Sequence, residues 1–440
     1  MTFEQAEQYI YSLSNLPRTE YMRDIKHCNI YLKRLQFFLD ILKNPEQHIP
    51  HYIHVTGTSG KGSITNMLHQ ILLESGKIVA SNVSPHPTSI EERWRLGDKT
   101  MSKQEFADII DAVIKPALDT YIRTSPYDMI SFFEIMTAIG LFWFAKHNAQ
   151  WCILEVGCGG KFDSTNIIPH KDIAIITNIG LDHIGIIGDN KKEIAIEKSG
   201  IILKNVPVFT QETDPTILDV FKNECDKQDT ILHISNNDYK KTNSDISEMT
   251  FLYNEKQFTI ETLGEHQINN AILCIDVAKH LGIKQEDIQI GLKKTNLPLR
   301  MEIMSKDPFV IIDGAHNPDK MKTSVKTMQE IKKLYPQANI HLLLGFSKDK
   351  NIETMLEQLS TLDPHTVSCT RNTAHAFKTV ATPKYIEEKI KLSTPETKTF
   401  ISLDPQLALK WSQTQMEKHD ILFITGSIYL SGEIQTYLTI

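Results

Sequence analysis

The stretch Tyr52-Ile-His-Val-Thr-Gly-Thr-Ser-Gly-Lys-Gly-Ser63 places a glycine-rich turn between two regular elements. Apolar residues before the glycines predict a short strand over 52–55, and apolar residues at helical spacing after them predict a helix over 64–75. Glycine permits a turn whose backbone N–H groups point inward, and the helix N-terminus adds partial positive charge. This order of elements predicts a polyphosphate-binding site.

Two side chains of the turn extend this prediction to a metal-bound nucleotide. Lys61 supplies a full positive charge, and Ser63 stands where a hydroxyl would meet Mg²⁺. The spacing is not the common nucleotide-binding one, since two residues separate Gly57 from Gly60 and a glycine follows Lys61. An ordinary loop is the alternative, which the flanking strand and helix disfavour. The predicted ATP contacts of the turn are Gly57, Thr58, Gly60, Lys61, Gly62 and Ser63.

Composition favours a globular protein that acts on small molecules. A chain of 440 residues exceeds the size at which single cores stop growing, so two domains are expected. With 41% hydrophobic residues and a net charge of −7, nothing favours nucleic acid or a membrane as partner. Six scattered cysteines without a C-x-x-C pair indicate reduced thiols. No secretory signal is seen, and the apolar run 130–145 is too short to span a bilayer, so we expect a cytoplasmic protein. We also expect it to act as a monomer.

The pattern along the first two thirds of the chain predicts an α/β domain. Strands alternate with helices, and polar and glycine residues follow the carboxyl end of each strand. This predicts a doubly wound, mostly parallel sheet that binds its ligand along that edge. A hairpin over 249–253 and 257–261 is expected on the sheet's margin, followed by a helix over 264–281. The other predicted strands are 78–80, 151–156, 173–176 and 206–209, and the main helices are 127–147 and 191–199.

A polar, proline-containing segment, 293–300, predicts the domain boundary. We therefore expect an N-terminal domain over 1–295 and a C-terminal domain over 296–440. Beyond the boundary the alternation restarts, so the second domain is also predicted to be α/β and of ordinary single-domain size. Its predicted strands are 309–312, 340–344, 366–369, 399–401 and 421–425.

Four side chains from four loops predict a magnesium site at the edge of the first sheet. Glu155 ends an apolar strand, where an unpaired buried charge would be costly, so either a metal or a lysine is its expected partner. His183 follows the next strand, although a lone histidine is more often structural. With Ser63 and Ser84, these residues would form an oxygen-rich site with one imidazole, which suits Mg²⁺ better than zinc.

Two further residues have competing interpretations. Lys198 lies in Glu197-Lys-Ser-Gly200, where a surface ammonium is the default expectation. Asp313 ends a predicted strand of the second domain, which is the position of a ribose-binding carboxylate. A turn-forming aspartate is the alternative there.

The motifs together resemble the folylpolyglutamate synthase/dihydrofolate synthase family of Mur ligases. The resemblance extends from about residue 30 to the C-terminus, with its blocks in one order. It rests on HVTGTSGKGS (54–63), SPH (84–86), SFFEIMTA (131–138), LEVGCGGKFDSTN (154–166), TNIGLDHIGIIGD (177–189), EIAIEKSGII (193–202), GEHQINNA (264–271), DGAHNP (313–318) and FITGSIYLSGE (423–433).

The resemblance implies a P-loop-type first domain, a Rossmann-like second domain and a role for each matching residue. It implies that Lys61 holds the β- and γ-phosphates, and that Ser63, Ser84 and Glu155 surround a first Mg²⁺. It further implies that His183 binds a second Mg²⁺ and that Lys198 is carbamylated. The remaining implied contacts are Gln267 and Asn270 near adenine, Arg300 on phosphate, Asp313 on ribose, and His316 and Ser427 near the incoming L-glutamate.

Four positions depart from the family pattern. Ser59 replaces asparagine in the turn, Lys161 replaces arginine, Leu299 replaces glycine before Arg300, and Pro87 stands where a hydrophobic residue is usual. The phosphate and metal residues are intact, so ATP use is expected. The choice of pterin substrate is left open by these changes.

The implied reaction is ATP-dependent formation of an amide between a pterin or folate carboxylate and glutamate, through an acyl phosphate. Lys61, Lys198, Arg300 and His316 are the expected catalytic residues. A ligase of the same family for another acid and a P-loop ATPase without ligase activity remain alternatives. A dinucleotide oxidoreductase is disfavoured, since G-x-G-x-x-G with a later acidic residue is missing.

Overall fold

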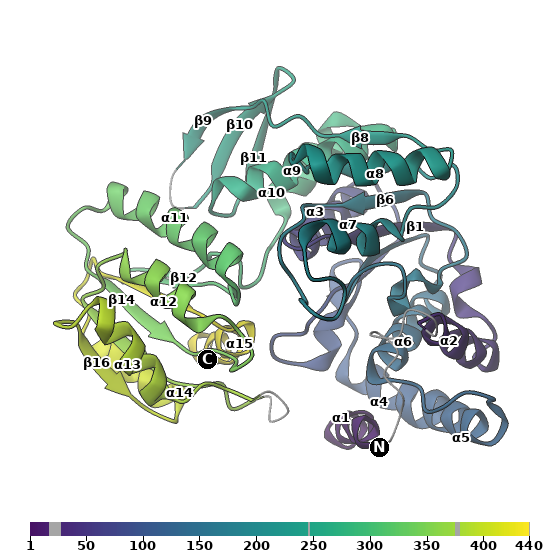
Figure 1. Ribbon diagram of the computed structural model, residues 1–440, viewed down its shortest axis with the longest axis horizontal. Coiled ribbons are helices and arrows are strands. Elements are labelled where there is room, and N and C mark those ends of the chain that lie inside the picture. The colour runs from purple at the N-terminus through teal and green to yellow at the C-terminus, as the bar shows by residue number, and fades with distance from the viewer. Residues whose placement is uncertain (17–27, 245–246, 375–378, 440) are drawn as a thin grey trace. The chain divides into compact units, whose positions relative to one another are not determined.

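A computed structural model describes residues 1–16, 28–244, 247–374 and 379–439 (Figure 1). These residues form two compact units, 1–238 with 269–295 and 239–268 with 296–440. Residues 239–268, which the sequence analysis grouped with the N-terminal domain, cluster with the second unit. The assignment of functions to 1–295 and 296–440 stays a prediction. Within the described residues no helix is long and apolar enough to cross a membrane.

The first unit is built on an eight-stranded sheet with the order β4-β3-β2-β5-β1-β6-β7-β8. The six strands from β2 to β8 in this order pair in parallel, and β3 and β4 are antiparallel at one edge. This confirms the predicted mostly parallel sheet. The strands are β1 (His51–Thr56), β2 (Val79–Asn82), β3 (Trp94–Leu96), β4 (Lys99–Thr100), β5 (Trp151–Glu155), β6 (Ile173–Ile176), β7 (Val208–Thr210) and β8 (Leu232–Ile234).

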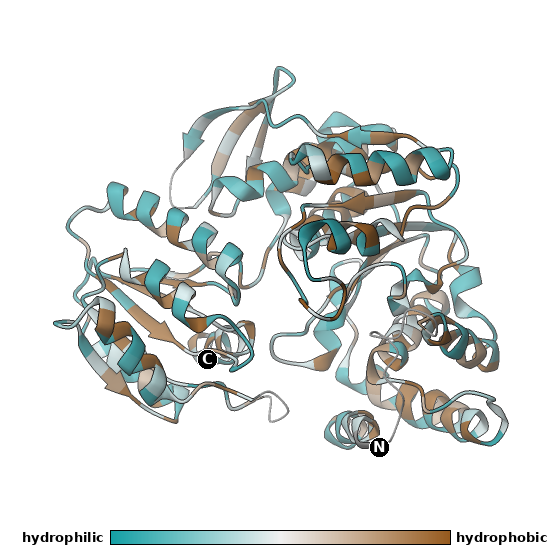
Figure 2. Cartoon of the chain, in the orientation of Figure 1, coloured by the Kyte–Doolittle hydropathy of each residue, from teal (hydrophilic) through white to brown (hydrophobic). Residues whose placement is uncertain are grey.

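Helices cover this sheet because its central strands are apolar on both faces (Figure 2). Every residue of β5 and of β6 is buried, as expected for strands covered on both sides. The helices are α1 (Phe3–Ser12), α2 (Ile30–Ile41), α3 (Lys61–Glu74), α4 (Lys103–Ile109), α5 (Lys115–Thr124), α6 (Phe132–Lys146), α7 (Lys191–Ser199), α8 (Pro215–Lys227), α9 (Glu265–His280) and α10 (Gln285–Lys294).

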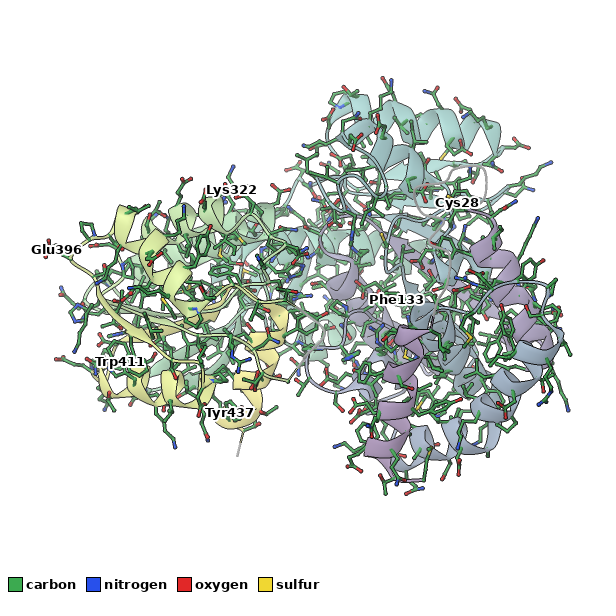
Figure 3. The ribbon with its side chains drawn as sticks, turned by 60° about the horizontal axis from the view of Figure 1, so that its bottom comes forward. Cys28, Phe133, Lys322, Glu396, Trp411 and Tyr437 are labelled. Atoms are coloured by element: carbon green, nitrogen blue, oxygen red, sulfur yellow. The ribbon has the colours of Figure 1, made fainter. Side chains whose placement is uncertain are left out.

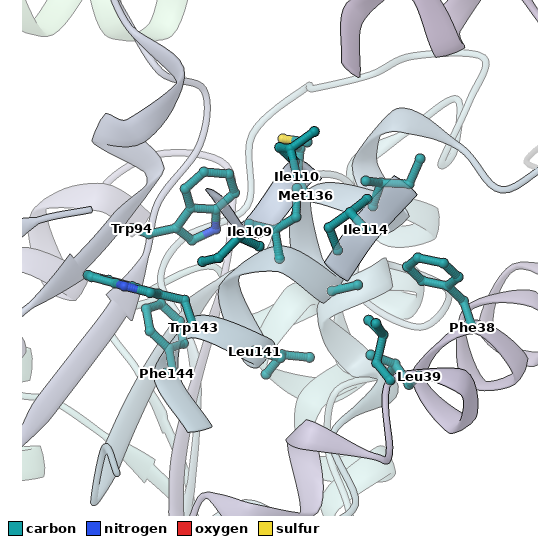
Figure 4. Packing of buried hydrophobic residues seen from close by; sticks show 14 of the residues in the cluster. Phe38, Leu39, Trp94, Ile109, Ile110, Ile114, Met136, Leu141, Trp143 and Phe144 are labelled. Carbon is teal, nitrogen blue, oxygen red and sulfur yellow. The ribbon is translucent and has the colours of Figure 1, made fainter. Parts of the chain in front are cut away.

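Helix α6 begins later than predicted, at Phe132 and not at residue 127. Ser131 is extended and caps the helix, and its partner in the capping box is Glu134. The Ser131 hydroxyl accepts from Glu134 N, one of the free N–H groups of the first turn, which favours a helix start there. The helix contributes to an apolar cluster in which Phe38, Trp94 and Met136 are buried (Figure 4).

The second unit contains a three-stranded antiparallel sheet with the order β11-β10-β9. The predicted hairpin is present, but its strands do not pair with the eight-stranded sheet, on whose margin they were expected. It pairs instead with β9, a strand that the sequence analysis missed because its residues are polar. The strands are β9 (Lys240–Ser244), β10 (Met249–Tyr253) and β11 (Lys256–Ile260).

The second unit also contains a six-stranded sheet with the order β12-β13-β17-β14-β15-β16. All its strand pairs are parallel except the antiparallel pair of β12 and β13. Strand β12 was not predicted from the sequence. This confirms the predicted α/β class. The strands are β12 (Glu302–Lys306), β13 (Phe309–Ile312), β14 (Ile340–Leu344), β15 (Thr366–Cys369), β16 (Lys398–Ile401) and β17 (Ile421–Thr425).

The two faces of this sheet carry different helices. Ile311 and Phe423 pack with residues of α11, α12 and α13, whereas their neighbours Ile312 and Ile424 pack with residues of α14 and α15. Because side chains alternate along a strand, β17 connects to a helix on the face opposite to those that follow β13 and β14. The helices are α11 (Pro318–Leu334), α12 (Ile352–Ser360), α13 (Pro383–Ser393), α14 (Pro405–Thr414) and α15 (Ile428–Leu438).

A buried ion pair joins α2 to α6 within the first unit. The Arg34 guanidinium donates from Nε to Glu134 Oε1 at 2.9 Å and from Nη2 to Glu134 Oε2 at 2.6 Å. Both side chains are almost completely buried. Glu134 also accepts from the backbone of Ser131 at 2.9 Å, so one carboxylate caps α6 and neutralises a buried cation.

Replacing Arg34→Met is expected to lower the free energy of unfolding by about 3–5 kcal/mol, because Glu134 would remain as a buried charge without its cation. Lys115→Met is the control. Lys115 Nζ lies 3.1 Å from Asp111 Oδ1 in a solvent-exposed ion pair, so this change should cost less than about 1 kcal/mol. Urea denaturation of both variants measures the difference. Equal, small losses would contradict the role of the buried pair.

Candidate functional site

The glycine-rich turn leads directly from the middle of the first sheet into α3. Strand β1 lies between β5 and β6, and α3 begins at Lys61, three residues earlier than predicted. Gly57 has φ of 141°, and a Cβ added there would lie 1.8 Å from Thr177 Oγ1, so a larger residue does not fit. Gly60 is the N-cap with φ of 87° and offers no capping side chain. The N–H groups of the first turn therefore lack a side-chain cap, as an anion site requires.

Two lysine side chains converge on one carbonyl oxygen of this turn. Lys61 Nζ donates to Gly57 O at 2.8 Å, and Lys198 Nζ donates to the same oxygen at 2.9 Å. Lys198 is buried, in contrast to the surface position that was the default expectation. Burial, and after it the charge of Lys61, lowers the pKa of Lys198 to about 8. The turn thus holds two cationic groups at close range.

Two of the predicted metal ligands lie beside this turn. The Ser84 backbone N–H donates to Glu155 Oε2 at 3.0 Å, and a Cβ added at Gly62 would lie 3.5 Å from the same oxygen. Ser63 is buried in the first turn of α3. Hydroxyl and carboxylate oxygens next to a phosphate turn fit Mg²⁺, which takes one or two carboxylates and completes its shell with water and phosphate.

His183 is less closely tied to this group. Its backbone has φ of 48°, its side chain is 38% exposed, and its Nε2 lies 3.7 Å from Asp182 Oδ1. No group of three or more His, Cys, Asp and Glu side chains in the described part of the chain could by itself hold a metal ion. A site here would therefore depend on the serines and on the ligand's own oxygens. The two-metal arrangement stays a prediction.

A buried hydrogen-bonded chain supports the loop after β5, and the sequence analysis missed it. Lys171 Nζ donates to His54 Nδ1 at 3.0 Å, which leaves His54 Nε2 to donate to Thr165 Oγ1 at 2.8 Å. Thr165 donates to Asp163 Oδ1, and Asp163 Oδ2 accepts from the backbone of Gly157 and Cys158. Burial lowers the pKa of Lys171 to about 7 and raises that of Asp163. The only sequence signal was that His54, Asp163 and Thr165 fall in the matching blocks, whereas Lys171 lies outside them.

In the second unit, Asp313 organises the segment that carries Arg300. Asp313 Oδ2 accepts from Met301 N at 3.1 Å, and its Oδ1 accepts from Ala315 N at 3.0 Å and Ser324 Oγ at 2.6 Å. The turn-forming role that was the alternative is therefore present, and a ribose contact would add to these three hydrogen bonds. A Cβ added at the neighbouring Gly314 would lie 2.8 Å from Arg300 Nη1, so a side chain there would have to displace the guanidinium.

The residue before Arg300 explains one departure from the family pattern. Leu299 has φ of 57°, a conformation that favours glycine and costs a leucine about 1–2 kcal/mol. Its side chain is fully buried in the cluster with Ile312 and Ile424, which contributes about 1.5–3 kcal/mol. Burial is thus large enough to offset the strain, so leucine can stand in place of glycine.

His316 and Ser427 lie at the carboxyl edge of the six-stranded sheet. His316 Nε2 accepts from Lys320 Nζ at 3.1 Å, so its Nδ1 carries the proton and donates to Gly314 O at 2.8 Å. Burial, and then the charge of Lys320, holds the pKa of His316 well below its ordinary value, so the ring is neutral. Ser427 is the N-cap of α15, and its hydroxyl is buried without a hydrogen-bond partner.

The two predicted adenine contacts belong to different units. Asn270 is buried in the first unit, where its Oδ1 accepts from Gln211 Nε2 at 3.0 Å and lies 2.7 Å from a Cβ built on Gly60. Gln267 is buried in the second unit. Gln211 was missed, although its place just after β7 at the ligand edge of the sheet was a usable signal.

Comparison with known proteins gives two domain matches and a full-length relative. The Mur ligase middle domain matches residues 127–278, and the Mur ligase glutamate ligase domain matches residues 299–428. A dihydrofolate synthase/folylpolyglutamate synthase of Bacillus subtilis is 30% identical to this chain, and the match covers 92% of this chain and 94% of that protein.

Solved structures give the same relationship. A crystal structure of the folylpolyglutamate synthase of Thermotoga maritima matches with a TM-score of 0.81 and 27% identity over 99% of this chain and 96% of that one. An FPGS–AMPPCP complex matches with a TM-score of 0.79 and 25% identity over 100% of both chains.

Replacing Gly57→Ala is expected to destabilise the first unit by about 2–4 kcal/mol, because the new methyl group overlaps Thr177 and the backbone is strained. Gly76→Ala is the matched control. Gly76 also has positive φ, but a Cβ there meets nothing within 4 Å, so the expected cost is about 1 kcal/mol. Chemical denaturation compares the two, and equal losses would show that packing against Thr177 is unimportant.

Proposed function

Because the chain belongs to the folylpolyglutamate synthase/dihydrofolate synthase family of Mur ligases, we propose that it joins L-glutamate to dihydropteroate, to reduced folates, or to both. Membership of this family makes the protein an ATP-dependent amide ligase, as the sequence analysis predicted. It supports this interpretation over a ligase for another acid and over a P-loop ATPase without ligase activity.

The observation that carries the proposal is the convergence of Lys61 and Lys198 on Gly57 O. Two ammonium groups that share one acceptor repel each other, and either carbamylation of Lys198 or an anion bound beside Lys61 relieves that repulsion. The uncapped first turn of α3 adds N–H donors to the same place. A triphosphate is the anion for which this arrangement is suited, and ATP is its source in this family.

The reaction has two steps that balance. The substrate carboxylate attacks the γ-phosphate of ATP, which forms an acyl phosphate and ADP. The amine of glutamate then attacks the acyl carbon, which forms the amide and releases phosphate and a proton. Lys61 and Arg300 neutralise charge on the transferred phosphoryl group, and the neutral His316 lies with Ser427 near the incoming glutamate. Gln267 and Asn270 contact the adenine, and Asp313 contacts the ribose.

Residues Ser63, Ser84 and Glu155 would hold one Mg²⁺, and His183 a second. Magnesium supplies charge neutralisation of the phosphates when it is bound. Carbamylation of Lys198 fits this arrangement, because a carbamate is an anion and would pair with a cation where an ammonium would repel it. The amine must be neutral to add CO₂, and the lowered pKa of Lys198 makes the neutral form far more abundant near pH 7–8 than in an ordinary lysine.

An aromatic group in the first unit supports a flat, ring-containing acid as the substrate. Tyr11 and Phe132 stack with ring centroids 5.6 Å apart and an interplanar angle of 11°, and Phe133 beside them is 61% exposed (Figure 3). His86 links this group to the loop after β2, since it bonds to Tyr11 Oη at 2.9 Å and accepts from Arg93 Nε at 2.8 Å. We propose that a pterin ring binds against these aromatic side chains.

The cellular setting is part of the same proposal. The six cysteines are reduced thiols, five of them buried, which is consistent with a reducing compartment. We propose that the enzyme acts in the cytoplasm, as a monomer, on small-molecule substrates.

Phosphate release from ATP tests the proposed function. Release is expected only when glutamate is present together with dihydropteroate or tetrahydrofolate, and not with either component alone. A Lys61→Ala variant should be slower by at least about 100-fold, because charge stabilisation is lost in the site. Lys146→Ala, on an exposed position of α6, is the control. If neither dihydropteroate nor tetrahydrofolate supports phosphate release, the folate assignment is rejected. A near-normal rate for Lys61→Ala would reject the phosphate role of Lys61.

Carbamylation of Lys198 predicts a dependence on pH and CO₂. The folded pKa of about 8 lies below the ordinary value of 10.5, so the neutral, reactive amine increases from pH 7 to pH 9, and the carbamylated fraction should rise with it. ¹³C NMR with labelled bicarbonate measures the carbamate signal, which Lys198→Arg should abolish and Lys204→Arg, at an exposed lysine, should leave unchanged. A signal that is absent from the wild type at every pH would contradict the modification.

A further inference from the structure

A buried lysine that the proposed mechanism does not use lies two residues before β6. Lys171 is 5% exposed, and burial lowers its pKa to about 7. Its ammonium donates three hydrogen bonds, to His54 Nδ1 at 3.0 Å, to Asn166 Oδ1 at 2.9 Å and to Ile201 O at 2.8 Å. None of these acceptors is charged, and within the described residues no carboxylate forms an ion pair with Lys171. Because a buried charge is normally paired, this ammonium calls for an explanation.

The three acceptors come from three separate segments of the first unit. His54 lies in β1, which leads directly into the glycine-rich turn. Asn166 belongs to the segment after β5, and its Nδ2 donates to Lys161 O at 3.0 Å and to Gly200 O at 3.3 Å. Ile201 follows the end of α7. One nitrogen atom therefore joins β1, the segment after β5 and the end of α7.

The end of α7 is the part of the chain that carries Lys198. Ile201 N donates to Lys198 O at 3.3 Å. A Cβ built on Gly160 would lie 2.8 Å from the same carbonyl oxygen, so the loop after β5 packs closely against it. The Lys198 side chain extends to Gly57 O at 2.9 Å. The contacts form a closed ring, from Lys171 through β1 to the turn and back through Lys198 and Ile201.

An ammonium is suited to the centre of this ring. It offers three N–H donors that diverge from one atom, whereas amide, hydroxyl and neutral imidazole side chains offer fewer. Donation to Nδ1 also sets the tautomer of His54, so that its Nε2 donates to Thr165 and the chain continues to Asp163. Asp163 accepts from the backbone N–H of Gly157, two residues after Glu155. The same cation therefore orders the loop that follows β5.

We propose that Lys171 is a positioning residue that holds Lys198 Nζ at Gly57 O. This inference rests on the proposed function, in which Lys198 acts beside the phosphate turn, and adds to it a residue that touches no substrate. Without the ammonium, His54 Nδ1 and Ile201 O would lose their donor, and the end of α7 would be free to move away from the turn. Lys171 lies outside the blocks that identify the family, so the motifs do not assign it this role.

Steady-state kinetics of the full chain test the effect of this positioning. Lys171→Met keeps the length of the side chain and removes all three donors. The kcat for phosphate release should fall about 10–100-fold, as expected when a residue that orients an active-site group is lost. The KM values for glutamate and for the pterin acid should change less than about 2-fold, because neither substrate is proposed to touch this network.

Chemical labelling reports the position of Lys198 without any substrate. The rate at which an amine-acetylating reagent modifies each lysine is measured by mass spectrometry. Lys198 is 2% exposed in the wild type and should react slowly. In Lys171→Met it should react at least about 10-fold faster, since the end of α7 opens more easily. Lys192, an exposed lysine of the same helix, is the internal reference and should react equally in both proteins.

A second variant breaks the same network without changing any charge. Asn166→Leu keeps the approximate size of the side chain but removes its bonds to Lys171, Lys161 O and Gly200 O. It should lower kcat and speed the labelling of Lys198, as Lys171→Met does. Lys204→Met, at an exposed lysine just beyond the end of α7, is the control and should change neither quantity. Urea denaturation of each variant gives the folded fraction to which the rates are normalised.

The two measurements separate failure of this inference from failure of the proposed function. Unchanged labelling of Lys198 in the folded variants would overturn the positioning role, and so would an unchanged kcat in a variant that labels faster. If the wild type shows no glutamate-dependent phosphate release, the proposed function is rejected. The labelling rates then still decide whether Lys171 holds Lys198 in place.

Discussion

The ammonium groups of Lys61 and of the buried Lys198 share the carbonyl oxygen of Gly57, and the fold of the first unit makes this possible. Lys61 reaches the oxygen from the start of α3, and Lys198 reaches it from the last turn of α7. The carbonyl can be presented only because Gly57 adopts a conformation with positive φ and packs without a side chain against Thr177. Like charges held this close are stabilised by an anion, which is why this turn is the proposed phosphate site.

The surrounding loops are held by contacts that fix backbone shape. Asn178 binds the N–H of Ser59 at 3.0 Å, and Thr177 donates to the carbonyl of the same residue at 2.6 Å. Because these hydrogen bonds involve the backbone of Ser59 and not its side chain, a serine can occupy the position where asparagine is usual. Lys161 is similar, since its backbone N–H donates to Glu197 O and a Cβ on Gly200 would meet its side chain. These departures leave the frame of the site intact.

In the second unit, a strained backbone segment carries the cationic side chain of Arg300. Leu299 and Met301 both have positive φ on either side of Arg300, and Asp313 holds this turn through the N–H of Met301. The energy of burying Leu299 offsets the strain.

The sequence by itself determined the elements whose pattern is local. The glycine-rich turn, the buried strand that ends at Glu155 and the βα alternation of both units follow from apolar periodicity and glycine within a few residues. The block matches then identified the family, because their order is specific. The edge strands β9 and β12 were missed, since polar residues on a margin give no clear period.

Only the tertiary structure decided which groups meet. Lys198 is buried and donates to Gly57 O, although the two residues are 141 positions apart in the chain. They meet because α7 and the glycine-rich turn reach the same edge of the sheet, and no local sequence pattern encodes this contact. The chain from Lys171 through His54 to Asp163 and the engagement of both Asp313 oxygens are of the same kind. Hydrogen bonding and burial depend on three-dimensional distance, whereas sequence patterns report on neighbours along one strand or one helix.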